Sequence, residues 1–129
     1  MMNDPLANAL SNILSAQKVC RTECIVSPTS AVIKKVFEIM QQHHYVGDCE
    51  MVQDKSLPYM KVKLLGTINK CKVIKPRFSV KNNGYKKFEK RYLPAKDIGI
   101  IIVSTPQGIM THLEAKKKSL GGSLLAYIY

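Results

Sequence analysis

Hydroxyl, amide and glycine residues gather near the carboxyl end of the chain, in the segment STPQGIM that follows a short apolar run. The hydroxyls of Ser104 and Thr105 can both donate and accept hydrogen bonds, and the side-chain amide of Gln107 can do the same. Gly108 lets another molecule approach the backbone closely because it has no side chain. Such groups can bind phosphates, sugar hydroxyls or base edges. The residues alone fit equally well with a polar loop tip that binds nothing.

A catalytic interpretation of this segment is weaker. Ser104 and His112 have the residue types of a nucleophile and its base, but their spacing across a turn does not fix a hydrogen bond between them. The residues around Ser104 do not form the GxSxG turn of hydrolases, and the chain has no GxxxxGK[ST] phosphate loop. We therefore expect that the protein is not an enzyme and that it binds no cofactor.

The cysteines give little support for a metal site. Cys20 and Cys24 form a CxxxC spacing, whereas Cys49 and Cys71 stand alone. Structural zinc sites usually take their ligands from close pairs, so we expect no metal. A site built from Cys20, Cys24 and Cys71 stays open as an alternative.

The basic charge of the chain is concentrated in its middle. The 129 residues carry a net charge of +11, and 46% of them are hydrophobic. Residues 61–96 hold twelve lysines and arginines against Glu89 alone, whereas residues 1–60 have a net charge of −1. A basic patch of this kind is typical of proteins that bind polyanions. Because most of these residues are lysine, they suit phosphate contacts better than base recognition.

Two further groups of residues, a pair of lysines and several aromatic residues, could contribute to nucleic-acid binding. Lys116 and Lys117 follow a capping-box sequence that begins at Thr111, so they should lie at the end of a short helix, where we expect them to contact phosphates. Aromatic residues among the cations can stack on unpaired bases. We favour a core position for Phe78 and Phe88 instead.

The first half of the chain predicts an α-β-α-β-β lobe. A helix should begin at Asp4-Pro5, and a second helix should be capped by Thr29 or Ser30 and bury a stripe that starts at Val32. Strands are expected at residues 23–26, 47–54 and 59–65, the last because apolar residues alternate there with lysines.

The second half predicts a strand-rich lobe with short helices. Residues 72–80 should be extended, residues 85–92 should form a short helix, and residues 100–103 should form a buried strand next to 124–129. The segment from Ser104 to Met110 is expected to be a tight loop, and the helix after it should end at Gly121-Gly122. The fold class is therefore α+β with two small lobes, residues 1–66 and 67–129.

Targeting segments are not expected. Met1–Ala9 has neither a basic region nor a long apolar run, and the longest apolar stretch, Ile100–Val103, is far shorter than the roughly 20 residues of a membrane helix. We expect a soluble protein from a reducing compartment.

Three segments are similar to a known family. DPLANALSNILSAQK near the start, INKCKVIKPRFSV in the middle and YLPAKDIGIIIVSTPQGIMTHLEAKKK followed by GG near the end resemble the universal small-subunit ribosomal protein S-eight family. The eukaryotic cytosolic member of this family is called S-fifteen-a. The resemblance covers nearly the whole chain, and the last segment is the most specific. The middle segment resembles the archaeal and eukaryotic pattern.

The resemblance implies a structural protein of the small ribosomal subunit that binds the central domain of small-subunit ribosomal RNA early in assembly. It implies direct RNA contacts from the loop of Ser104, Thr105, Gln107 and Gly108, with Met110 behind it. The resemblance also implies a cytosolic ribosome as the location, with passage through the nucleolus in a eukaryote.

The resemblance adds RNA contacts from the first lobe, at Ser30 and Lys34. Three residues depart from the family pattern: Pro106 replaces a frequent serine, Ala31 a frequent lysine, and Ser123 a frequent glutamate or lysine. We expect neighbouring ribosomal proteins as partners, and no membrane, DNA or second copy of the chain. The alternatives are a free-standing RNA-binding regulator or chaperone and, with only Ser104 and His112 to support it, an RNA-directed hydrolase.

Overall fold

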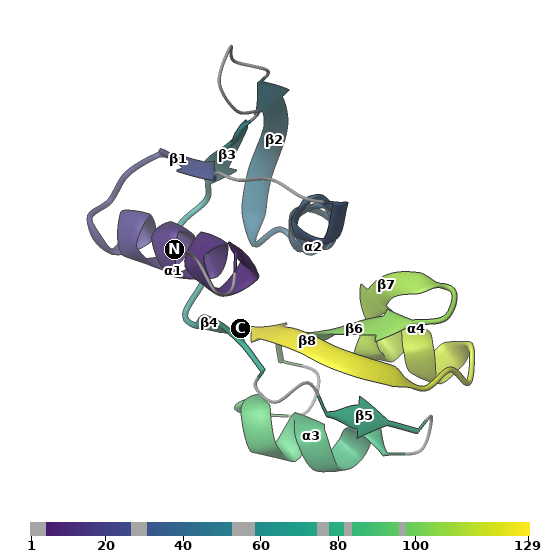
Figure 1. Cartoon of the computed structure of the whole chain (residues 1–129). Coiled ribbons are helices and arrows are strands. Elements are labelled where there is room, and N and C mark those ends of the chain that lie inside the picture. The colour runs from purple at the N-terminus through teal and green to yellow at the C-terminus, as the bar shows by residue number, and fades with distance from the viewer. Residues whose placement is uncertain (1–4, 27–30, 53–58, 75–77, 82–83, 96–97) are drawn as a thin grey trace. The chain divides into compact units, whose positions relative to one another are not determined.

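The computed structural model describes residues 5–26, 31–52, 59–74, 78–81, 84–95 and 98–129. They form helices and antiparallel sheets, so the predicted α+β class is confirmed. Two compact units, Met1–Ile68 and Asn69–Tyr129, are colored from purple to teal and from teal to yellow in Figure 1. Each unit is described separately.

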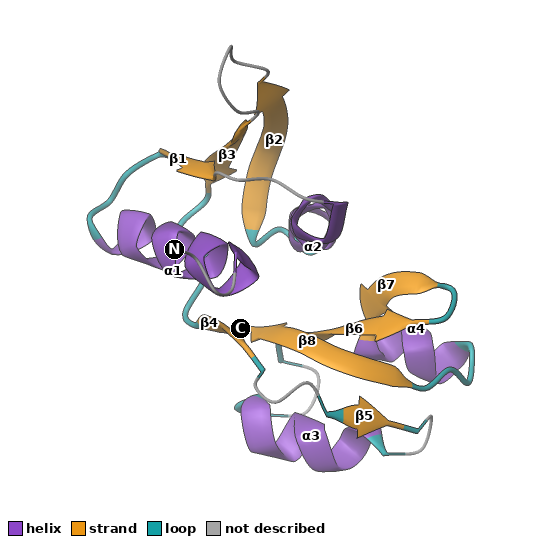
Figure 2. Cartoon of the chain, in the orientation of Figure 1, coloured by secondary structure: helices purple, strands orange, loops and turns teal. Residues whose placement is uncertain are grey.

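The first unit has the predicted α-β-α-β-β order (Figure 2). Its elements are α1 (Pro5–Lys18), β1 (Glu23–Val26), α2 (Ala31–Gln42), β2 (Val46–Val52) and β3 (Tyr59–Leu64). The strands form an antiparallel sheet in the order β1-β3-β2. The alternation on β3 is confirmed, because Met60 and Val62 are buried.

The apolar stripe of α2 packs into the core of this unit through Ile33, Val36, Phe37 and Met40, which are at most 1% exposed. The stripe is narrower than predicted, since Val32 is 40% exposed. Val32 lies next to Ile33 along the chain, and adjacent helical residues point about 100° apart. The predicted caps at Asp4 and at Thr29 or Ser30 lie outside the described residues.

The second unit contains a five-stranded antiparallel sheet in the order β4-β8-β6-β7, with β5 also paired to β8. Its elements are β4 (Cys71–Val73), β5 (Ser79–Val80), α3 (Tyr85–Tyr92), β6 (Ile100–Thr105), β7 (Gly108–Thr111), α4 (His112–Lys117) and β8 (Gly122–Ile128). The predicted short helix and the predicted pairing of the last strand with the buried strand are confirmed. One core joins Tyr85 of α3 and Ala115 of α4 to Val103 and Leu124 of the sheet.

The predicted loop from Ser104 to Met110 is wrong in its extent. Strand β6 continues through Thr105, and β7 begins at Gly108, so only Pro106 and Gln107 connect the two strands. Polar residues in a row, taken alone, predict a loop. Serine and threonine nevertheless fit a strand when cross-strand pairing and burial favour it, and Thr105 is only 8% exposed.

The start of α4 is as predicted, and its end is not. The Thr111 hydroxyl accepts a hydrogen bond from the Glu114 amide at 3.3 Å, as the capping box requires. The helix ends at Lys117, and Ser119, two residues further on, has a left-handed φ of 54°. The Leu120 amide donates to the Ala115 carbonyl at 2.8 Å. This is a Schellman turn with serine in the position that glycine usually takes. Gly122 instead opens β8.

Candidate nucleic-acid interface

The β6–β7 hairpin ends in a two-residue tip. Thr105 pairs with Gly108 across the hairpin, and the Thr105 hydroxyl donates to the Gly108 carbonyl at 2.7 Å. Gly108 has a φ of 125°, a conformation that side chains disfavour. Pro106 fixes its own φ near −65°, which limits the freedom of the turn. These features produce a short, rigid tip.

Some of the predicted binding residues are exposed at the hairpin tip, and others are buried. Pro106, Gln107 and Gly108 are exposed, and Ser104 is half-buried. Thr105 is buried, and its hydroxyl proton already bonds to Gly108, so this residue shapes the tip. Met110 is 5% exposed and belongs to the core, where it supports the hairpin from within.

Three serines form a row across neighbouring strands. Ser79 of β5 pairs with Ser123 of β8, and Ser123 pairs with Ser104 of β6. Residues directly opposite each other in a sheet project to the same face, so the three hydroxyls share one surface. Ser79 is exposed, and the other two serines are half-buried. We call these residues the serine row.

A β-bulge creates the alignment of Ser104 with Ser123. The pairing of β6 with β8 runs regularly from Ile100–Ile128 to Ile102–Ala126 and then shifts by one residue. Without that shift, Ser104 would face Leu124. The bulge therefore brings two hydroxyls together where a regular ladder would place an aliphatic side chain.

The serine row lies in a shallow groove beside the hairpin tip. The groove is lined by residues from three segments: Ser79, Val80, Lys81, Ser104, Thr105, Pro106, Gly121, Gly122 and Ser123. The side chain of Lys81 is exposed at its border. Ser79, Lys81 and Ser123 were not predicted as site residues. The expected pairing of the last strand with the buried strand was the one signal that Ser123 lies near Ser104.

The two lysines of α4 differ in their surroundings. The Lys116 ammonium pairs with the Glu89 carboxylate of α3 and is half-buried. Lys117 is exposed, and among the described residues no carboxylate pairs with it. A lysine without a nearby carboxylate is better able to contact a phosphate, so the structure separates the roles of these neighbours.

His112 is positioned as a structural residue. It is 3% exposed, and its Nδ1 accepts a hydrogen bond from the Ile101 amide at 3.1 Å. The proton therefore lies on Nε2, which is 3.3 Å from Oε1 of Glu89. Both ring nitrogens are engaged, so His112 does not act as the base for Ser104.

Of the two residues of the first unit that are predicted to contact RNA, the structure describes Lys34. Lys34 is exposed on α2, one position before Lys35, which pairs with Glu38 at 3.7 Å. Ser30 lies outside the described residues.

The aromatic residues of the basic segment pack against the core of the second unit, as predicted for Phe78 and Phe88. Their ring centroids lie 5.5 Å apart, and the guanidinium of Arg91 lies 5.4 Å from the centroids of both Phe78 and Tyr92. Arg91 covers partly buried rings through cation–π contacts, so these rings are poorly placed to receive a base.

The four thiols differ in burial, from the exposed Cys20 to the buried Cys71. Among the described residues, no three His, Cys, Asp or Glu residues lie close enough together to hold an ion. Burial raises the pKa of the Cys71 thiol to about 11. The pKa of Cys24 is also raised, because burial outweighs the opposing effect of the Arg21 charge and of a backbone hydrogen bond. Raised pKa values disfavour the thiolate that metals bind.

An α+β protein with a basic second unit, a rigid polar tip and a groove lined by hydroxyls has the features of the nucleic-acid-binding class. The model of the Ribosomal protein S8 family matches residues 4–129, nearly the whole chain. The chain belongs to this family, and the predicted resemblance is confirmed. It is a small-subunit ribosomal protein that binds ribosomal RNA. None of the described helices has the length and apolar character needed to cross a membrane.

Proposed function

We propose that the chain is a structural constituent of the small ribosomal subunit that binds the central domain of small-subunit ribosomal RNA, supports subunit assembly and catalyses no reaction. The observation that carries the proposal is the serine row in its groove beside the exposed hairpin tip. We assign the direct contacts to Ser104, Gln107 and Gly108, and Thr105 and Met110 hold the tip in shape.

The chemistry of this surface suits folded RNA. Small hydroxyls and exposed backbone fit the shallow minor groove of an RNA helix, where 2′-hydroxyls and base edges can be reached. The serine row extends the tip into a surface with several donors and acceptors at fixed positions. Selectivity would then come from the shape of the RNA that fits both the tip and the groove.

Lysines supply the part of the affinity that does not depend on sequence. Lys117 of α4 and Lys81 at the border of the groove are exposed and can contact phosphates. Each contact releases counterions from the RNA, so binding weakens as salt increases. Lys116 acts mainly through its ion pair with Glu89, and Lys34 and Ser30 add contacts from the first unit.

Family membership supports association with a ribosome. The segment INKCKVIKPRFSV favours a cytosolic ribosome, reached in a eukaryote through the nucleolus.

The test is a chemical footprint of the purified protein on small-subunit ribosomal RNA, with an unrelated structured RNA of equal length as the control. We expect protection confined to one helical region of the central domain and none on the control RNA. Equal protection of both RNAs, or protection only in other domains, would contradict the proposal.

A further inference from the structure

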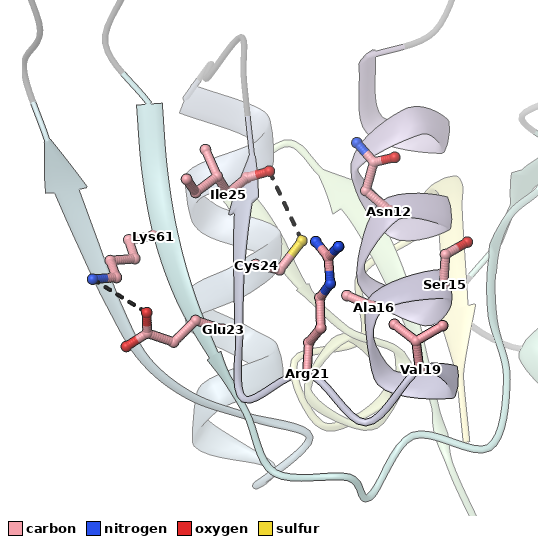
Figure 3. Close-up of a pocket in the computed structure, with 9 residues that line it drawn as sticks. All are labelled: Asn12, Ser15, Ala16, Val19, Arg21, Glu23, Cys24, Ile25 and Lys61. Carbon is pink, nitrogen blue, oxygen red and sulfur yellow. Dashed lines mark hydrogen bonds and ion pairs between the residues drawn. The ribbon is translucent and has the colours of Figure 1, made fainter.

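A groove in the first unit separates the end of α1 from strand β1. Residues from both elements line it, together with Lys61 of β3: Asn12, Ser15, Ala16, Val19, Arg21, Glu23, Cys24, Ile25 and Lys61. Figure 3 shows Asn12, Ser15 and Val19 on the helix and Arg21 in the space between the helix and the strand. The groove has a volume of about 670 Å³. None of the residues proposed above for RNA binding lines it.

Among the described residues, the strand that borders this groove has another strand paired to one of its edges and none to the other. In the described part of the chain, the sheet begins with β1, which pairs only with β3. The Leu64 amide donates to the Thr22 carbonyl at 2.8 Å, so the backbone groups of Thr22 face β3. Alternate residues of an antiparallel strand direct their groups to opposite sides. The N–H and C=O groups of Glu23 and Ile25 therefore face away from β3, and the Ile25 carbonyl accepts a long hydrogen bond of 3.8 Å from the Cys24 thiol of the same strand (Figure 3).

Apolar side chains lie on both sides of the groove. Val19, directly after α1, is 65% exposed, and Ile25 on β1 is 59% exposed. An edge strand with an exposed aliphatic side chain is a site where another strand can pair. Until a partner strand covers this edge, the outward backbone groups of β1 are open to hydrogen bonds with water.

The positive charge of Arg21 indicates which kind of side chain a partner would bring to the groove. Arg21 lies in the groove, and none of the carboxylates in the described residues forms an ion pair with it. The other charges at this site are matched, since Lys61 pairs with Glu23 at 3.2 Å. Arginine binds carboxylates through two parallel hydrogen bonds, so an acidic side chain is the complementary group.

We propose that this groove binds an extended segment of a neighbouring small-subunit protein, which adds a strand to the free edge of β1. The segment pairs with the backbone of Glu23 and Ile25, covers Val19 and Ile25 with apolar side chains, and places a carboxylate on Arg21. This mode of recognition takes affinity from backbone hydrogen bonds and specificity from alternate side chains. This binding of a protein segment is separate from RNA binding, because it uses residues of the first unit other than Ser30 and Lys34.

Photo-crosslinking in assembled particles tests the proposal. A benzophenone amino acid is placed at Ile25, or at Leu65 as a matched control with 51% exposure, and the protein is incorporated into purified small subunits. We expect Ile25 to crosslink to a single polypeptide segment, identified by mass spectrometry, and Leu65 to give no crosslink to that segment. A crosslink from Ile25 to ribosomal RNA, or none above the Leu65 background, would overturn the proposal.

Hydrogen exchange supplies a second measurement that needs no variant. We expect the amides of Glu23 and Ile25 to exchange at least about tenfold more slowly in the small subunit than in the free protein. Equal exchange rates in both samples count against the added strand. In the free protein, Ile25→Lys should leave the ribosomal RNA footprint unchanged, so a failure here is distinguishable from a failure of RNA binding.

Discussion

Gly122 lies so close to Ser104 that a Cβ atom at position 122 would be 2.3 Å from the carbonyl oxygen of Ser104. Strands β8 and β6 therefore approach each other at this point only because residue 122 has no side chain. The same point carries the pairing of Ser104 with Ser123. Gly122 thus fixes the spacing of the strands beneath the serine row.

We expect Gly122→Ala to lower the free energy of unfolding by about 1–3 kcal/mol, because the strands must shift to accept a methyl group. The same shift should weaken binding to the cognate ribosomal RNA. Urea unfolding and filter binding measure the two effects. The neighbouring change Ser123→Ala is the control for stability and should alter it by less than about 0.5 kcal/mol. A Gly122→Ala protein as stable as the original would refute the close approach.

Removing a hydroxyl of the serine row should weaken the binding of the cognate RNA and leave the contacts between lysines and phosphates unchanged. Ser79→Ala, Ser104→Ala and Ser123→Ala should each weaken cognate RNA binding roughly two- to tenfold, the value of one hydrogen bond of about 0.5–1.5 kcal/mol. The salt dependence should stay the same, because no phosphate contact is removed. Ser11→Ala on the exposed side of α1 is the matched control. Equal losses on an arbitrary RNA duplex would show that the row does not select.

Thr105 is predicted to act through the shape of the tip. Thr105→Val removes the hydroxyl that donates to the Gly108 carbonyl and keeps the volume of the side chain. Stability should fall by about 1 kcal/mol, and cognate RNA binding should weaken because the tip loosens. Thr105→Ser, which retains the hydroxyl, should restore most of both. If valine and serine variants bind RNA equally, the hydrogen bond does not shape the binding surface.

The neighbours Lys116 and Lys117 should differ in salt-dependent binding. Lys117→Gln should reduce the slope of log affinity against log salt by about 0.7–0.9, the value of one phosphate contact. Lys116→Gln should change the slope less, because Glu89 already pairs with that ammonium. Binding titrations at several salt concentrations measure both slopes. Identical slopes for the two variants would mean that the ion pair does not persist in the complex.

Much of the fold could be predicted because apolar residues recur with clear periods. The stripe of α2 and the alternation of Met60 with Lys61 on β3 determine which faces are buried, and burial dominates the choice of local structure. Strand β7 was missed because its residues follow directly on a polar turn. Its pairing with β6 depends on contacts that a local pattern does not contain.

The site could be predicted only where it is continuous in sequence. Ser104 to Gly108, at the end of the β6–β7 hairpin, lie in one segment, so their hydroxyls, amide and glycine are visible together in the sequence. Ser79 and Ser123 join it through the sheet, and the bulge in the pairing of β6 with β8 decides that Ser123 faces Ser104. The pairing of Lys116 with Glu89 likewise depends on how α3 and α4 pack.

The most direct test of the account asks what the hairpin tip touches in the ribosome. A benzophenone amino acid at the exposed Gln107 is illuminated in purified small subunits, and the crosslinked molecule is identified by primer extension and mass spectrometry. We predict a crosslink to ribosomal RNA within the central domain. A crosslink from Gln107 to protein alone, or to RNA of another domain, would contradict the central claim.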